Sequence, residues 1–182
     1  MYWSGELEEH EEVREKLLSK IDEARSERIV NNKSGNDEDD YTAANGDYHV
    51  DRPNKYYAKF LFGQTKIRSQ IEEVIKNKYG IAEISGITDA WFQQYKENDA
   101  HEWHIHGNAS WACVYYLELP EGAPGTEIKE PFTEKILRPD VSEGDILIFP
   151  GQTMHRSPPN EVDKRKTIIA FNLDCSSCHP DG

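Results

Sequence analysis

Hydrophobic residues recur at helical spacing in the first part of the chain and at alternate positions later. Over residues 6–30 the apolar side chains lie mostly three or four positions apart, which predicts one amphipathic helix with Ser4 as its N-cap. A second helix is predicted over residues 65–79 by the same spacing. The apolar faces consist of Leu7, Val13, Leu17, Leu18 and Ile21 in the first helix, and Ile67, Ile71, Val74 and Ile75 in the second.

After Gly80 the pattern changes towards a period of two, which is typical of strands. Residues 31–47, rich in Asn, Gly and Asp, are expected to form an exposed acidic loop. Two helices followed by short strands predict an α+β, mainly β fold, in which an antiparallel sandwich or barrel carries helices on one side. The expected strands are residues 81–85, 90–96, 111–119, 126–130, 135–138, 145–149 and 166–173.

The chain has 182 residues, which is the size of one domain. Within it we expect N-terminal helices and the acidic loop over residues 1–80, a β-rich core over residues 81–174 and a tail over residues 175–182.

Charge and composition restrict the partners. The net charge of −13 argues against a nucleic-acid partner, and no apolar run is long enough to cross a membrane. The acidic N-terminus does not resemble a secretory signal, and three cysteines are too few for a disulfide framework. We therefore expect a cytoplasmic protein that acts on a small molecule or a peptide, with an oligomeric state that the sequence does not indicate.

Three of the seven histidines cluster in the segment His101-Glu102-Trp103-His104-Ile105-His106. On an extended strand, residues i and i+2 project from the same face, so His104 and His106 could bind one metal ion. A solvated histidine-rich loop is the alternative. His155 follows the apolar segment 145–150 and is a candidate third ligand.

Arg165 opens the last predicted strand, ten residues after His155. Alternation places it on the same face as Ile169 and Phe171, where a cation needs an anionic partner. A small dicarboxylate bound by the guanidinium would be such a partner. The alternative is a residue at the strand end that reaches solvent or pairs with an acidic side chain.

Taken together, these segments resemble a known family. The order is His-x-His, then Val114-Tyr115-Tyr116-Leu117, then the segment Ile146-Leu147-Ile148-Phe149-Pro150, then His155 and Arg165. This order resembles the 2-oxoglutarate- and iron(II)-dependent dioxygenases, in particular the prolyl-hydroxylase-like branch and small oxygenases of bacteria and phages. The resemblance covers about residues 89–174.

The resemblance implies a fold, cofactors and site residues. The fold would be a double-stranded β-helix, or jelly roll, supported by N-terminal helices. Its cofactors would be Fe(II), the cosubstrate 2-oxoglutarate and O2, and its reaction would be C–H hydroxylation with release of succinate and CO2. His104, His106 and His155 match the metal positions, Arg165 and Tyr116 match residues that bind the far carboxylate of 2-oxoglutarate, and Tyr95 matches a tyrosine that faces the cosubstrate. Thr126 lies on a matching strand without a role of its own.

The sequence departs from the family at His106, where the family has a carboxylate. Three interpretations follow. The metal site could be His104, His106 and His155, which we favour because imidazole suits iron. Alternatively, Glu102 could supply the carboxylate, or His106 could turn away and leave an open position.

Two other functions remain open from the sequence. A cupin-like enzyme could use the three histidines without 2-oxoglutarate, and a non-catalytic jelly-roll module could retain the residues by descent. The C-terminal segment Cys175-Ser176-Ser177-Cys178-His179 fits a haem-attachment pattern, but its position at the end of the chain makes us interpret it as a tail.

Overall fold

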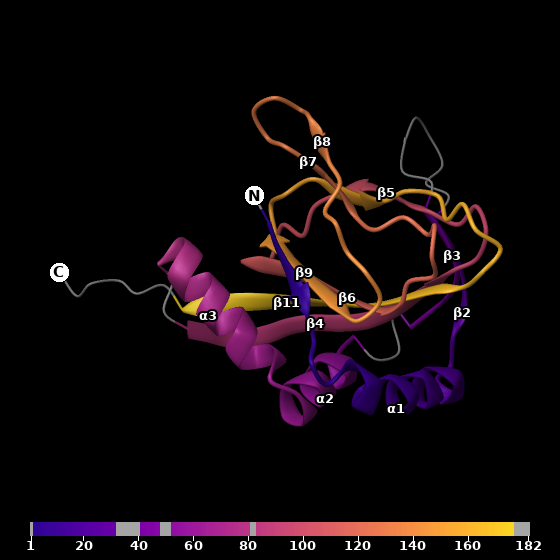
Figure 1. The fold of residues 1–182 in the computed structure, drawn as a ribbon, viewed down its shortest axis with the longest axis horizontal. Coiled ribbons are helices and arrows are strands. Elements are labelled where there is room, and N and C mark those ends of the chain that lie inside the picture. The colour runs from indigo at the N-terminus through magenta and orange to yellow at the C-terminus, as the bar shows by residue number, and fades with distance from the viewer. Residues whose placement is uncertain (1, 32–40, 48–51, 81–82, 177–182) are drawn as a thin grey trace.

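The computed structural model describes all residues except 1, 32–40, 48–51, 81–82 and 177–182. Two antiparallel sheets face each other, and helices α1, α2 and α3 lie against the outer face of the larger sheet (Figure 1). This arrangement confirms the predicted mainly β fold with helices on one side. In the described part of the chain, no helix combines the length and the apolar composition needed to cross a membrane.

The larger sheet has seven strands and the smaller sheet has four. In spatial order, the larger sheet consists of β1 (Trp3–Glu6), β9 (Asp145–Pro150), β6 (Trp111–Glu118), β11 (Lys166–Ser176), β4 (Glu83–Tyr95), β3 (Tyr41–Gly46) and β2 (Glu27–Asn31). The smaller sheet consists of β5 (His101–His104), β10 (His155–Ser157), β7 (Glu127–Lys129) and β8 (Ile136–Leu137).

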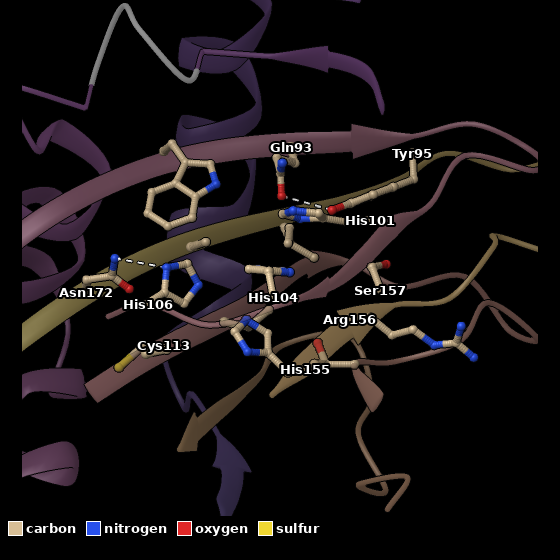
Figure 2. Close-up of a pocket in the computed structure, with 16 residues that line it drawn as sticks. Gln93, Tyr95, His101, His104, His106, Cys113, His155, Arg156, Ser157 and Asn172 are labelled. Carbon is tan, nitrogen blue, oxygen red and sulfur yellow. Dashed lines mark hydrogen bonds between the residues drawn. The ribbon is translucent and has the colours of Figure 1, made fainter. Parts of the chain in front are cut away.

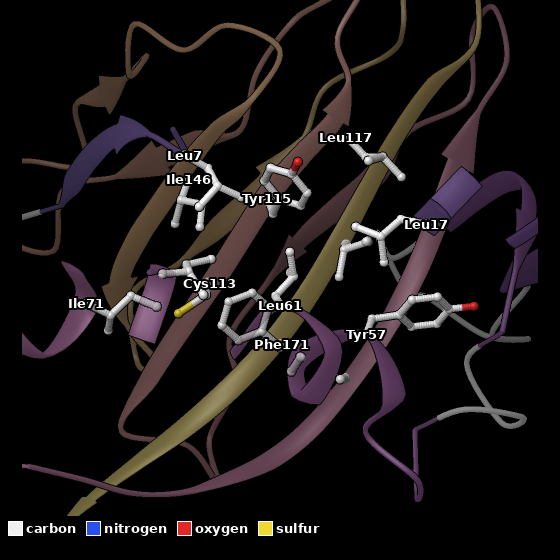
Figure 3. Close-up of a cluster of buried hydrophobic side chains, with 14 of the residues drawn as sticks. Leu7, Leu17, Tyr57, Leu61, Ile71, Cys113, Tyr115, Leu117, Ile146 and Phe171 are labelled. Atoms are coloured by element: carbon white, nitrogen blue, oxygen red, sulfur yellow. The ribbon is translucent and has the colours of Figure 1, made fainter. Parts of the chain in front are cut away.

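The central strands of the larger sheet bury both of their faces, because helices cover one and the smaller sheet covers the other. Successive side chains point to opposite faces. On β11, Ile169 and Phe171 belong to the core on the helix side (Figure 3), whereas Ile168 belongs to the second core between the sheets. This alternation decides which residues of β11 reach the space between the two sheets.

The first predicted helix is shorter than its pattern suggested. Helix α1 (His10–Glu23) is flanked by two strands, β1 and β2, so the prediction of a helix over residues 6–30 is wrong at both ends. Ser4 lies in β1 and is not an N-cap; the residue at that position is Glu9. The pairing of β1 with β9 and of β2 with β3 overrides the local helical pattern, although all five predicted apolar residues are buried.

The second predicted helix is confirmed as α3 (Ile67–Tyr79), which ends at Gly80 in the left-handed conformation that glycine adopts most easily (φ 69°). Helix α2 (Tyr56–Gln64) was not predicted, although Tyr57 and Leu61 have helical spacing and are buried. These helices pack their apolar faces against the large sheet.

The strand predictions differ from the structure in three places. Residues 41–46 of the expected acidic loop form β3, while residues 32–40 lie outside the described residues. The two strands expected over 81–85 and 90–96 are one strand, β4, whose pairing with β11 contains two register shifts. Strands β5 and β10 were not predicted, and both carry candidate ligands.

Candidate metal centre

The three candidate ligands come together between the two sheets. His104 ends β5 and His155 begins β10, and the two residues are direct partners in the antiparallel pair. His106 lies two residues beyond β5. One nitrogen from each imidazole lies within 4.8 Å of the others (Figure 2), and no Asp or Glu among the described residues joins this group.

Backbone hydrogen bonds orient two of the three rings. Nδ1 of His104 lies 2.7 Å from the carbonyl oxygen of Glu102, and Nδ1 of His155 lies 2.8 Å from the carbonyl oxygen of Thr153. A carbonyl only accepts hydrogen bonds, so each Nδ1 carries the proton and each Nε2 keeps its lone pair. This outer-shell arrangement is the usual one around metal-binding histidines.

The Glu102 interpretation is not supported by this geometry. Glu102 contributes its backbone carbonyl to the orientation of His104, and its carboxylate is outside the group of candidate ligands. Among the described residues, the structure groups the three histidines as candidate ligands.

His106 is positioned by Asn172 and by the loop that follows β9. Nδ2 of the Asn172 amide lies 3.4 Å from Nδ1 of His106 (Figure 2). If the amide is turned by 180°, Oδ1 takes the place of Nδ2 and accepts an Nδ1 proton, which leaves Nε2 of His106 with the lone pair that a metal needs. The backbone N–H of His106 donates to the carbonyl of Gly151 at 2.8 Å.

Gly151 is required by this close backbone approach. A Cβ atom at this position would lie 2.1 Å from the carbonyl oxygen of Ala109 and 2.9 Å from that of His106. Both contacts are with backbone, which cannot rotate away. The segment that holds His106 therefore depends on a residue without a side chain.

Burial keeps the imidazoles uncharged. Burial, together with the nearby His104 and Arg52, lowers the pKa of His106 to about 3. Burial also lowers the pKa of His155 and of His101 well below the usual value. Neutral imidazole is the metal-binding form, so this donor set fits a divalent transition metal such as iron without prior loss of protons.

His101 supports the site without joining the ligand group. Its ring stacks on that of His104, with centroids 3.8 Å apart and planes within 13° of parallel. The stack fixes the plane of the His104 ring.

The histidines line a cavity between the sheets that also contacts Tyr95 and Thr126. The cavity encloses about 30 Å³, which is room for about two water molecules. A larger ligand therefore has to push its walls apart. Tyr95 donates a hydrogen bond to Gln93 at 2.9 Å, and both residues line the cavity.

Tyr116 lies behind the cavity wall. Its hydroxyl donates to Oγ1 of Thr126 at 2.9 Å and accepts the N–H of Thr126 at 3.0 Å. Burial raises the pKa of Tyr116 to about 12, so the hydroxyl stays protonated. Tyr116 acts on the cavity through Thr126.

Arg165 does not lie among the residues that line the cavity. Arg165 shares a face with Ile169 and Phe171 as expected, but that face is covered by the helices. The side chain is 41% exposed, and its guanidinium binds both carboxylate oxygens of Glu118, at 2.8 and 2.9 Å. The anionic partner expected for Arg165 is therefore Glu118 of the protein itself and not a bound dicarboxylate.

The neighbouring residue, Lys166, lies on the cavity side. It is 1% exposed, and its Nζ donates to the carbonyl of Pro124 at 2.8 Å and to Oγ of Ser157 at 2.7 Å. Nζ also lies 4.9 Å from the centroid of the Tyr95 ring. Burial lowers the pKa of Lys166 to about 7, and its hydrogen-bond partners among the described residues are neutral.

Sequence reasoning missed Lys166 because it placed the basic residue of the site one position too early. The signal was present in the alternation of the last strand, since Ile168, Ala170 and Asn172 share a face with Lys166 and line the cavity. The sequence alone did not show which face of the strand would meet the histidines.

The C-terminal cysteine pattern is only partly described. Cys175 is a free thiol at the end of β11, and Cys178 and His179 lie outside the described residues. Cys113 is buried, as expected.

The fold of the chain was compared with those of known proteins. No family model matches the chain, and no curated protein matches it. Among solved structures, it is similar to an oxidoreductase of the 2OG-Fe(II) oxygenase family from Burkholderia pseudomallei, with 10% identity, a TM-score of 0.67 and coverage of 88% of this chain and 78% of that chain.

Two prolyl hydroxylases are also similar. The viral collagen prolyl hydroxylase from Paramecium bursaria Chlorella virus-1, solved with 2OG, matches at 14% identity over 94% of each chain with a TM-score of 0.58. The enzyme from Trichoplax adhaerens, in complex with a peptide, matches at 17% identity over 95% of this chain and 83% of that chain with a TM-score of 0.61. At these identities the comparison establishes the jelly-roll fold of 2OG-Fe(II) oxygenases, as the sequence resemblance implied.

Proposed function

We propose that this protein is an Fe(II)- and 2-oxoglutarate-dependent oxygenase that hydroxylates a C–H bond of its substrate and releases succinate and CO2. The observation that carries the proposal is the convergence of His104, His106 and His155 between the sheets of this fold. Two of these rings already present Nε2 to a common point, and burial keeps His106 and His155 neutral.

Lys166 is the residue that we assign to the far carboxylate of 2-oxoglutarate, in place of Arg165. Its ammonium group contacts Ser157 and the Tyr95 ring, and both residues line the cavity beside the histidines. A carboxylate would supply the negative charge that the carbonyl of Pro124 and the hydroxyl of Ser157 lack. Thr126, held by Tyr116, would offer a hydroxyl to the same carboxylate.

The contribution of the protein is position, charge and exclusion of water. Iron and 2-oxoglutarate together would supply the oxygen chemistry that converts C–H into C–OH. The carbonyls of Glu102 and Thr153 hold the tautomers of two ligands, and Asn172 holds the third ring. Lys166 fixes the cosubstrate at one end, and its proton is retained when the bound carboxylate is present. The apolar wall of Ile168 and Ala170 limits access of water to the site.

Succinate release tests this function directly. The purified protein is incubated with Fe(II), ascorbate and 2-oxoglutarate in air, and succinate is measured by mass spectrometry. We expect slow release from the wild type and none from His104→Ala. His10→Gln is the matched control, because His10 is a buried histidine on the helix side of the sheet and bonds to Tyr115 at 2.6 Å. Equal succinate release from wild type and His104→Ala would contradict the proposal.

The donor set favours one alternative, a three-histidine metalloenzyme that does not use 2-oxoglutarate. No carboxylate among the described residues accompanies the histidines, and the cavity is small. Oxygen uptake measured with and without 2-oxoglutarate separates the two functions. Uptake that does not depend on 2-oxoglutarate favours the alternative, and the absence of bound metal by elemental analysis after iron loading favours a binding module.

A further inference from the structure

A second, larger cavity adjoins the candidate metal centre. It measures about 400 Å³ and shares His106 and Asn172 with the first cavity. Its volume lies towards the lower end of the range of small-molecule sites, about 300–1,000 Å³. A molecule bound there would lie against one side of the candidate iron ligands. The inference that follows rests on the proposed function.

A fixed cation lines this cavity. The guanidinium of Arg52 is held at Nε by Asp89, 2.8 Å away, and its Cζ lies 4.1 Å from the centroid of the Trp91 ring. Its side chain is 19% exposed. Because the guanidinium is already held on two sides, a ligand that binds it loses little side-chain entropy.

The lining of this cavity holds one cation, Arg52, and one carboxylate, Asp89, although the chain as a whole is acidic, with a net charge of −13. Burial raises the pKa of Asp89, and Arg52 and Lys55 act against that rise. The iron of the proposed function would add positive charge beside His106, and this balance favours an anionic group on Arg52.

Two buried polar side chains line the same cavity. Oγ1 of Thr88 is buried and has no hydrogen-bond partner among the described residues. Oδ1 of Asn172, a residue that is 7% exposed, also has no partner in the described part of the chain. If the amide turns so that Oδ1 accepts from His106, the unpartnered atom becomes Nδ2, a donor. Thr88 and Asn172 therefore favour a polar ligand.

We propose that this cavity binds the substrate, and that the substrate is a small polar molecule whose carboxylate binds Arg52. The carboxylate is the group that matches a planar guanidinium with two parallel hydrogen bonds. Lys166 would thus bind a carboxylate of the cosubstrate, and Arg52 would bind the carboxylate of the substrate. A C–H bond near the carboxylate end of the substrate would then face His106.

Direct binding tests the inference without turnover. The protein is loaded with Zn(II), which has no redox chemistry, and with excess 2-oxoglutarate, which occupies the Lys166 side. Saturation-transfer NMR then follows pools of the twenty standard free amino acids, the matching carboxamides, and capped tripeptides that contain Asp or Glu. We expect at least one free amino acid to bind, and its carboxamide to bind at least about tenfold more weakly.

Variants locate the site. Arg52→Gln should weaken binding of that amino acid about tenfold or more, and Arg52→Lys, which keeps the charge but loses the planar fork, should weaken it less. Arg68→Gln, which removes an exposed arginine on α3, is the control and should bind like the wild type. The inference is overturned if amides bind as well as acids, if only the capped peptides bind, or if Arg52→Gln binds normally.

Failure of this inference is distinguishable from failure of the proposed function. Succinate release without any added substrate reports on iron and 2-oxoglutarate alone. Release of succinate together with no binding of any carboxylate overturns the inference and leaves the oxygenase. Binding of a carboxylate at Arg52 without succinate release supports the second site and overturns the oxygenase.

Discussion

Arg165 and Lys166 are adjacent in the sequence and carry the same charge, but they lie on opposite faces of one sheet. Arg165 reaches the helix side, where Glu118 and solvent stabilise it. Lys166 reaches the space between the sheets, where burial lowers its pKa to about 7 and its hydrogen-bond partners are neutral. Arg165 is neutralised by Glu118 on the face away from the histidines, whereas Lys166 lies beside the cavity with neutral partners and is prepared for an anionic ligand.

The histidines show the same contrast between the two faces. His10, on the helix side, bonds to Tyr115 and takes part in a network with Glu143. His155, on the cavity side, uses Nδ1 for a backbone carbonyl and keeps Nε2 for the point that three histidines share. Substitutions on the two faces test whether function is confined to the cavity face.

Removal of a ligand should have the largest effect. We expect His155→Ala to reduce affinity for Fe(II) or Co(II) by more than the roughly 10–100-fold that loss of an outer-shell partner costs. Isothermal titration of the metal into metal-free protein measures it. His10→Gln should leave metal affinity within about twofold while it lowers the free energy of unfolding by about 1 kcal/mol through the lost hydrogen bond. Equal metal affinity of His155→Ala and wild type would show that the histidines form no metal site.

Substitutions of Lys166 and Arg165 should differ in their effect on the affinity for 2-oxoglutarate. Lys166→Met should raise the dissociation constant of 2-oxoglutarate roughly 10–100-fold, because a hydrogen-bonded charge pair contributes about 1.5–3 kcal/mol. Titration of 2-oxoglutarate into the metal-loaded protein, followed by absorbance or calorimetry, provides the value.

Arg165→Met serves as the matched control in the same titration. It should leave that dissociation constant unchanged, and it should cost less than about 1 kcal/mol of stability because the Glu118 pair is partly exposed. If Arg165→Met weakens 2-oxoglutarate more than Lys166→Met does, the assignment of the faces is wrong.

A single methyl group added at Gly151 should displace the segment that holds His106 and weaken metal binding. Gly151→Ala should lower metal affinity about 10–100-fold, as expected when a ligand is displaced by the backbone that holds it. The neighbouring Gly107→Ala is a stringent control, since a Cβ atom at Gly107 meets nothing within 4 Å. The same titration of Co(II) compares both variants. Matching affinities in the two variants would mean that the close approach at Gly151 does not position His106.

The smallest expected effect is on the pH dependence of the free energy of unfolding. The folded-state pKa of Lys166, about 7, lies below its usual value of 10.5, so the unfolded chain binds one more proton than the folded protein between these values. Stability of the ligand-free protein should therefore rise with pH above about 7, by on the order of 1 kcal/mol per pH unit from this group, and should be insensitive to it below pH 7.

Lys166→Met should remove that part of the slope in urea unfolding experiments, and Arg165→Met should retain it, because burial does not lower the pKa of Arg165 into this range. A slope that is the same in all three proteins would indicate that Lys166 is charged in the folded state throughout.

Much of the site was predictable because its chemistry is local. The His104–His106 spacing and the apolar strand before His155 identified the three histidines, and the structure brings them together. The prediction of a helix over residues 6–30 was wrong at both ends, because these ends are strands: β1 pairs with the distant β9, and β2 pairs with the next strand, β3. A one-residue difference in strand position changes the face of a side chain, and this explains how Lys166 was missed beside Arg165.

The alternation along the last strand, the two cations at its start and the imidazoles available for a metal can all be read from the amino-acid order. Which face of that strand meets β5 and β10, and therefore which cation is buried, depends on the packing of the folded chain. This packing also brought Arg52, more than fifty residues before His106 in the chain, to the same cavity. The physical reason is that alternation assigns neighbours to opposite faces, while the packing of helices and of the second sheet gives each face its environment.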